Sequence, residues 1–119
     1  MQLEIRMFAP FIEPARLPDT EIEAMGFEQT LVKALEIGVR RFDRKTLAKL
    51  SGIHYPHFGD LIAGRRPFPA VKLSRFCMLC GCAYPKQWLE LQERREQEEY
   101  KKVSSEAMYE FMQKAMKAA

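Results

Sequence analysis

The chain has 119 residues, 47% hydrophobic and 29% charged, which is the balance of a globular protein rather than a disordered one. This length supports one compact domain with an arm or tail, and it needs no disulfide bonds. No stretch approaches the roughly eighteen apolar residues of a membrane span, and the first residues lack the pattern of a secretory signal. We therefore expect a cytoplasmic protein that does not contact a membrane and whose three cysteines are reduced.

The net charge of +3 is small, but its distribution along the chain is uneven. Residues 40–75 carry nine basic and two acidic side chains, a balance of +7, whereas residues 4–36 carry three basic and seven acidic, a balance of −4. Positive charge concentrated in one segment is typical of a protein that binds a polyanion. Clustered charges can also simply solvate a surface, so charge alone leaves both interpretations open.

The first eighteen residues are predicted to form an arm. Pro10, Pro14 and Pro18 prevent a helix there. Apolar and charged residues alternate over Leu3–Met7, which indicates a short strand. A lone strand is not stable, so this one is expected to dock on the domain or to pair with another chain.

Four helices are predicted between residues 19 and 81. The first and longest begins at Asp19 or Thr20 and ends near Gly38, because apolar residues recur every three or four positions. Short helices over 44–51 and 55–63 follow, the first capped by Asp43 and ended by Gly52, the second ended by Gly64. The fourth begins at Pro69 and ends at Gly81.

The C-terminal region beginning at Pro85 is also predicted to be helical, either as one long helix or as two, since Ser104 or Ser105 could cap a separate last helix. The whole chain is thus expected to be all-α, with five or six helices. It divides into an N-terminal arm (1–18), a helical domain (19–84) and a C-terminal helical extension (85–119).

The two short helices have the spacing of a helix-turn-helix. Two helices that cross steeply need a small residue at the crossing, and Ala48 supplies it. They need a left-handed residue in the turn and a buried apolar residue after it, which Gly52 and Ile53 supply. Apolar residues then continue at helical spacing through Phe58 and Leu61, so the opposite side of the second helix is left free.

The segment from Thr46 to Ile53 (TLAKLSGI) and the segment from Leu61 to Pro67 (LIAGRRP) resemble the helix-turn-helix of the lambda-repressor and Cro family. The resemblance covers about residues 28–82 and implies a lambda-repressor-like fold in which the domain 19–84 binds DNA. It implies that the second helix of the motif enters the major groove and reads base edges. The residues carried over to base contacts are Tyr55, Pro56, His57, Gly59 and Asp60.

Phosphate contacts are expected from basic residues around the motif, which set register and salt dependence rather than sequence preference. These residues are Arg40, Arg41, Arg44, Lys45, Arg65 and Arg66. The chain departs from the family pattern at His54, where a serine-like cap is common, and at Arg44 and Tyr55, where glutamine is common. No arginine, asparagine or glutamine faces the groove from residues 55–63, so DNA shape is expected to contribute to recognition.

Two other sets of residues have competing interpretations. Cys77, Cys80 and Cys82 could be core residues, metal ligands or redox-sensing thiols, and we expect core packing because a structural zinc site needs four ligands. His54 and His57 could act with a carboxylate as acid and base, but no motif completes a catalytic site. We therefore expect no enzyme activity, no metal, no cofactor and no small-molecule substrate.

A wide apolar stripe runs through the C-terminal region and could complete the core, bind another protein or bind a second copy of the chain. We expect a homodimer, because most oligomers are symmetric and operators of such proteins are usually palindromic. The residues assigned to dimerisation are Tyr100, Val103, Met108, Phe111, Met112 and Met116.

The resemblance and the charge pattern together predict a sequence-specific regulator of transcription that binds double-stranded DNA, of the phage or plasmid type and acting as a repressor. The alternative is a protein-interaction module, such as an antirepressor or an inhibitor, that uses the helix-turn-helix face against another protein.

Overall fold

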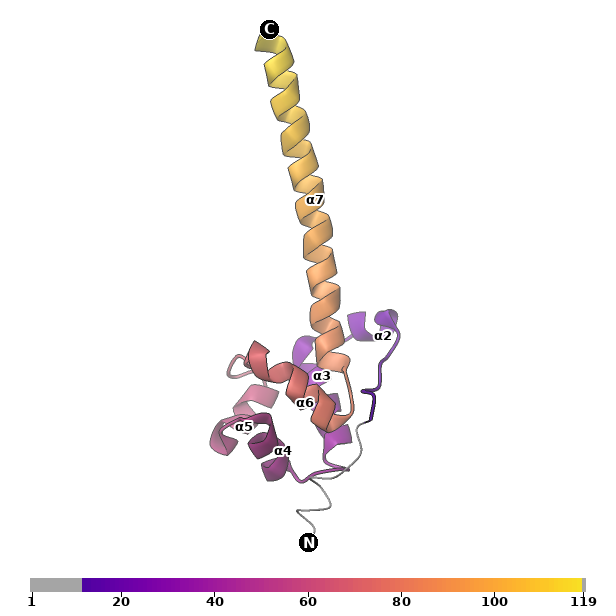
Figure 1. Ribbon diagram of the computed structural model, residues 1–119, viewed down its shortest axis with the longest axis vertical. Coiled ribbons are helices and arrows are strands. Elements are labelled where there is room, and N and C mark those ends of the chain that lie inside the picture. Colours follow the sequence, from indigo (N-terminus) through magenta and orange to yellow (C-terminus); the bar gives the residue numbers. More distant parts are fainter. Residues whose placement is uncertain (1–11, 119) are drawn as a thin grey trace. The chain divides into compact units, whose positions relative to one another are not determined.

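The structure is a computed structural model that describes residues 12–118, and these residues form helices and no strands (Figure 1). The predicted all-α class is confirmed, and the predicted strand Leu3–Met7 lies outside the described residues. The chain divides into two compact units, one ending at Leu89 and one beginning at Glu90. The helices of the described residues are α2 (Asp19–Glu23), α3 (Phe27–Gly38), α4 (Arg44–Ser51), α5 (Tyr55–Ile62), α6 (Ala70–Cys80) and α7 (Tyr84–Ala118).

The expected single helix from Asp19 to Gly38 is wrong, because the structure has two helices there, α2 and α3. Gly26 is extended (φ −80°, ψ 166°) and caps α3, and its backbone N–H donates to Gln29 Oε1 at 2.9 Å. The carbonyl of Met25 accepts a hydrogen bond from Trp88 Nε1 at 3.0 Å. An indole 63 residues farther along the chain thus holds the segment between the helices.

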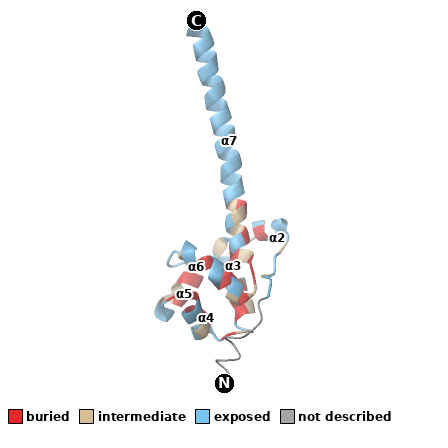
Figure 2. Cartoon of the chain, viewed as in Figure 1, coloured by how far each residue is buried: buried red, intermediate tan, exposed pale blue. Residues whose placement is uncertain are grey.

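The core of the first unit lies between α3, α4, α5 and α6 (Figure 2). Phe58 of α5 and Phe76 of α6 are both fully buried, and their ring centroids lie 6.1 Å apart. Leu47 and Ala48 face them from α4 and are also fully buried. These helices therefore bury apolar faces against one another and leave their other faces to solvent.

Helices α3 and α6 lie close together at Gly38. A Cβ at Gly38 would lie 2.6 Å from Cys80 Sγ, which is closer than real Cβ atoms come to a neighbour. The absence of a side chain at Gly38 therefore sets how closely the two helices pack. All three cysteines lie in this buried region, so core packing is the role that the structure shows for them.

The described part of the arm docks on the domain through its backbone. Ala15 N–H donates to the carbonyl of Gly81 at 3.0 Å, and Ala83 N–H donates to the carbonyl of Ala15 at 2.9 Å. The buried amide of Gln87 accepts from Leu17 N–H at 3.0 Å and donates to the Leu17 carbonyl at 2.8 Å. These bonds satisfy the backbone of the arm where no sheet is available.

Because the three thiols are buried, we expect the stability of the protein to fall at alkaline pH. Burial raises the pKa of Cys77 and of Cys82 to about 11, and it raises that of Cys80 as well, against 9.0 for an unperturbed thiol. Below pH 9 the three thiols keep their protons in both the folded and the unfolded chain, so the free energy of unfolding does not depend on their ionisation. As the pH rises from 9 towards the folded values, the unfolded chain loses its protons first and stability falls.

We therefore expect the free energy of unfolding to fall by roughly 1.4 kcal/mol per pH unit for each thiol above pH 9. Denaturant titrations at a series of pH values measure this slope. The variant Cys80→Ala serves as the comparison, because it should show a shallower slope. A free energy of unfolding that stays constant between pH 9 and 11 in the natural sequence would contradict the burial of the thiols.

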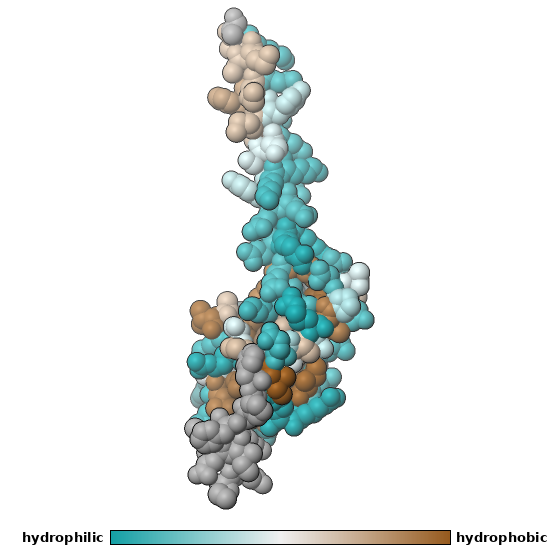
Figure 3. All heavy atoms as spheres, turned by 45° about the vertical axis from the view of Figure 1, so that its right-hand side comes forward, coloured by the Kyte–Doolittle hydropathy of each residue, from teal (hydrophilic) through white to brown (hydrophobic). Residues whose placement is uncertain are grey.

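Helix α7 is a single helix of 35 residues, so the open question of one C-terminal helix or two is settled in favour of one. The six residues assigned to dimerisation are all exposed along it. In the space-filling view, hydrophilic side chains cover its middle and apolar ones gather towards its C-terminal end (Figure 3). None of the described helices has the length and apolar content to cross a membrane.

Candidate nucleic-acid interface

Helix α4 has a well-formed start and a tight end. The Asp43 carboxylate accepts from Thr46 N–H at 2.8 Å and from the Thr46 hydroxyl at 2.9 Å, which caps the first turn. At the other end, Ile53 N–H donates to the carbonyl of Ala48 at 2.8 Å and Gly52 N–H to that of Lys49 at 3.0 Å. This pair of bonds is the Schellman arrangement, which ends a helix in a left-handed residue.

Gly52 is that left-handed residue, with φ 76° and ψ 28°. A side chain would be strained in this conformation, so glycine at this position sets where α4 stops. Ile53 follows and is buried, which anchors the turn in the core. On the outer side, the ammonium group of Lys72 from α6 donates to the carbonyl of Gly52.

Helix α5 turns three apolar side chains towards the core, and the residues on its other side are exposed or half-buried. Phe58, Leu61 and Ile62 are buried, whereas Tyr55 is 43% exposed. Pro56 and Ala63 are exposed too, and Gly59 and Asp60 are half-buried. The start of α5 has Pro56 in its first turn and no side-chain cap from His54, as the sequence suggested.

Asp60 holds the two arginines that follow α5. Its carboxylate accepts from Arg65 Nε at 2.8 Å and lies 3.6 Å from Arg66 Nε. The hydrogen bond from Arg65 lowers the pKa of Asp60, although burial opposes that shift. The sequence predicted that Asp60 accepts a hydrogen bond from a base. The structure shows that its carboxylate also fixes the positions of Arg65 and Arg66.

Arg44, at the start of α4, lies beside α5. The guanidinium of Arg44 stands 5.5 Å from the centre of the Phe58 ring, and its Nη2 would lie 3.4 Å from a Cβ at Gly59. Glycine at position 59 therefore leaves room for this guanidinium. Lys45 is exposed next to Arg44. Arg44 and the two arginines that pair with Asp60 therefore all lie close to α5.

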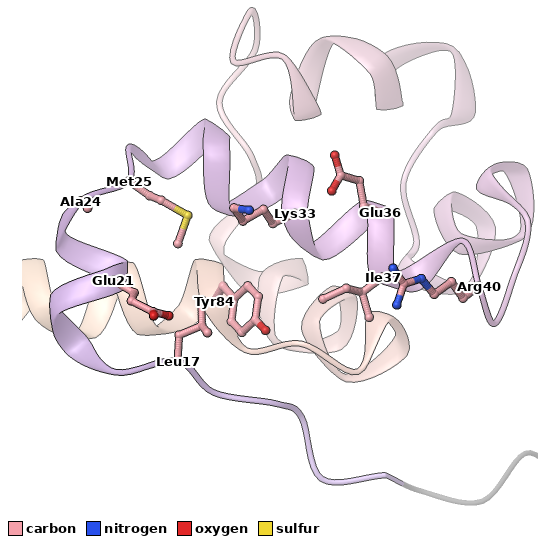
Figure 4. Close-up of a pocket in the computed structure, with 9 residues that line it drawn as sticks. All are labelled: Leu17, Glu21, Ala24, Met25, Lys33, Glu36, Ile37, Arg40 and Tyr84. Carbon is pink, nitrogen blue, oxygen red and sulfur yellow. The ribbon is translucent and has the colours of Figure 1, made fainter.

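Arg40 and Arg41 lie elsewhere. Arg41 Nη1 donates to the carbonyl of Leu79 at 3.4 Å, and its guanidinium lies 5.5 Å from the centre of the Phe42 ring. Its positive charge therefore lies at the C-terminal end of α6, where it interacts favourably with the helix dipole. Arg40 lines a pocket of about 470 Å³ together with Ile37 and Tyr84 (Figure 4). Neither side chain belongs to the surface around α5.

A groove at the start of α5 brings the two histidines together with cations from the segment after α5 and from α6. It has a volume of about 310 Å³ and lies between α5, the segment after it and α6. His54 and His57 contact each other in it, with ring centroids 4.8 Å apart and planes at 79°. The residues that line it are Ile53, His54, His57, Leu61, Arg66, Pro67, Pro69 and Lys72.

Lys72 is the functional candidate that sequence reasoning missed. It was counted in the basic segment, but nothing in the α6 sequence shows which side of that helix meets the turn at Gly52. The spacing of the buried residues Leu73, Phe76 and Cys77 could have placed it at the margin of the core face.

The chain matches no protein-family model, no curated protein and no solved structure in the comparisons made.

Proposed function

We propose that this protein regulates transcription by binding double-stranded DNA, with α4, Gly52 and α5 acting as a helix-turn-helix of the lambda-repressor and Cro kind. The observation that carries the proposal is the side of α5 turned away from the core, where Tyr55 and Pro56 are exposed, Gly59 and Asp60 are half-buried, and cations lie nearby. These cations are Arg44, Lys45, Arg65, Arg66 and Lys72.

In this proposal the cations contact phosphates on either side of the major groove, and α5 lies between them. Tyr55, with its exposed phenol, and Pro56 meet base edges near the start of α5. Gly59 lies beside the Arg44 guanidinium, so the lack of a side chain there lets this cation approach the DNA next to α5. Because Asp60 already holds two arginines, few side chains remain for direct reading, and DNA shape carries part of the preference.

We propose that a second copy of the chain covers the apolar stripe of α7. Phe111 is 70% exposed, Tyr100 73% and Met116 76%, and these side chains recur along one helix. Exposed apolar area of this extent is typical of an interaction surface. A symmetric pair of chains would present two α5 helices, which suits a palindromic operator in the cytoplasm.

The experiment that tests the DNA proposal is selection of bound fragments from a random pool of duplexes. Tyr55→Ala should then change the preference among selected sequences, by roughly 1–3 kcal/mol for a lost base contact. Arg66→Ala should weaken binding to all duplexes by a similar factor, because it removes a phosphate contact. Affinities of both variants for several selected duplexes measure the difference.

If Arg66→Ala changed only the preference among sequences, the assigned roles of these residues would be wrong. If no duplex were enriched, the interaction module, an antirepressor or inhibitor that binds protein through α5, would be the better interpretation.

A further inference from the structure

The groove at the start of α5 gathers four side chains that are cationic or can become so. His54, His57, Arg66 and Lys72 line it, and its remaining lining is apolar. None of its lining residues is acidic. A groove of about 310 Å³ with this lining offers several donors and positive charges to one anionic group.

The charged residues near the groove lie on α5, on α6 and on α3. On α5, Asp60 lies outside the groove but pairs with Arg66 at 3.6 Å. On α6, the ammonium of Lys72 donates to a backbone carbonyl, which leaves its charge in place. On α3, Glu28 lines a neighbouring pocket together with Arg66 and does not line this groove. Among the described residues, the carboxylate that is ion-paired with a residue of the groove is that of Asp60, through Arg66.

The two imidazoles make this charge depend on pH. Histidine changes its charge between about pH 5 and 8, unlike the other side chains of the groove. Two protonated rings in edge-to-face contact, beside a guanidinium and an ammonium, repel one another. An anion between them removes that cost, so anion binding and proton uptake favour each other by the same factor.

We propose that this groove binds a backbone phosphate of duplex DNA, and that protonation of His54 and His57 strengthens the contact. The inference rests on the proposed function and deepens it, because it makes DNA affinity depend on pH. It also moves His57 from reading a base edge to contacting a phosphate. Asp60 does not supply this dependence, since its lowered pKa keeps it charged throughout the range.

The first test measures affinity for a mixed-sequence duplex at low salt, because a phosphate contact needs no operator. The natural sequence should bind about tenfold more tightly at about pH 6 than at about pH 8. The double variant His54→Gln, His57→Gln should change by less than about threefold over the same range. Lys49→Gln, an exposed change on α4 outside the groove, is the control and should keep the tenfold ratio.

The second test uses the proton resonances of the imidazoles. The sequence contains only two histidines, so in protein without added histidines every imidazole signal reports on this groove. Adding the duplex should change the chemical shifts of both rings, and the change should be larger at about pH 6 than at about pH 8. Inorganic phosphate, added alone in a parallel titration, distinguishes a site for free phosphate from one for DNA.

Duplex binding whose pH dependence is unchanged in the double variant would overturn the groove proposal and leave the proposed function intact. Imidazole signals that respond to inorganic phosphate and not to the duplex would overturn DNA as the occupant. A natural chain that binds no duplex at either pH would overturn the proposed function and this inference together.

Discussion

Replacing Phe58 by alanine is expected to lower the free energy of unfolding by about 3–5 kcal/mol, a large part of what a domain of this size possesses. Phe58 is fully buried, and its ring packs against Phe76 with centroids 6.1 Å apart. It is one of three α5 side chains buried in the core, and the Arg44 guanidinium lies over its ring. Its removal leaves a cavity at the joint between α5 and α6.

Denaturant titration followed by helical content measures this loss. Phe58→Leu is the matched control, since it keeps an apolar side chain and removes less volume, and it should cost clearly less. Tyr55→Ala, on the exposed side of the same helix, should change stability by less than about 1 kcal/mol. Equal losses for Phe58→Ala and Tyr55→Ala would mean that α5 does not bury the side assigned to it.

The elements that the sequence predicted best are those with local signals. Asp43, Gly52 and Gly81 end or begin helices through bonds within a few residues, so they could be read from the chain alone. The inward side of α5 followed from the spacing of Phe58, Leu61 and Ile62 for the same reason.

The features that the sequence did not predict depend on partners far along the chain. The break before α3 is held by Trp88, 63 residues after Met25. Arg41 bonds to Leu79, 38 residues away, a contact that the sequence did not predict. Lys72 meets Gly52 across 20 residues. Charge and spacing along the chain say little about such contacts, because the packing of helices decides them.

The pairing of Asp60 with Arg65 and Arg66 spans only five and six residues, but it was missed as well. The path of the chain after Ile62 decides it. Gly64 is left-handed (φ 81°), and the backbone N–H groups of Arg65 and Arg66 both donate to the Asp60 carbonyl, at 2.9 and 3.2 Å. This turn brings both arginines back towards the helix that they follow.

Pairing of two chains through α7 and DNA binding through α5 are the two parts of the proposed function, and variants of α7 test how they are connected. If two chains pair through its apolar stripe, Phe111→Glu should separate them, since it places a charge among the apolar side chains of that stripe. Gln113→Glu adds the same charge at a polar position of α7 and is the matched control. Both changes lie on an exposed helix, so they should leave the first unit folded.

The salt dependence of the affinity of the whole chain for a selected duplex tests the central claim most directly. If each chain touches about four phosphates and two chains bind together, log affinity should fall against log salt with a slope near −7. Affinity should then drop by about 10⁴-fold between 50 and 200 mM salt. Phe111→Glu should show about half that slope, and Gln113→Glu the full one. A slope near zero in the natural chain would contradict the account, because α5 and its cations would then not be meeting a nucleic acid.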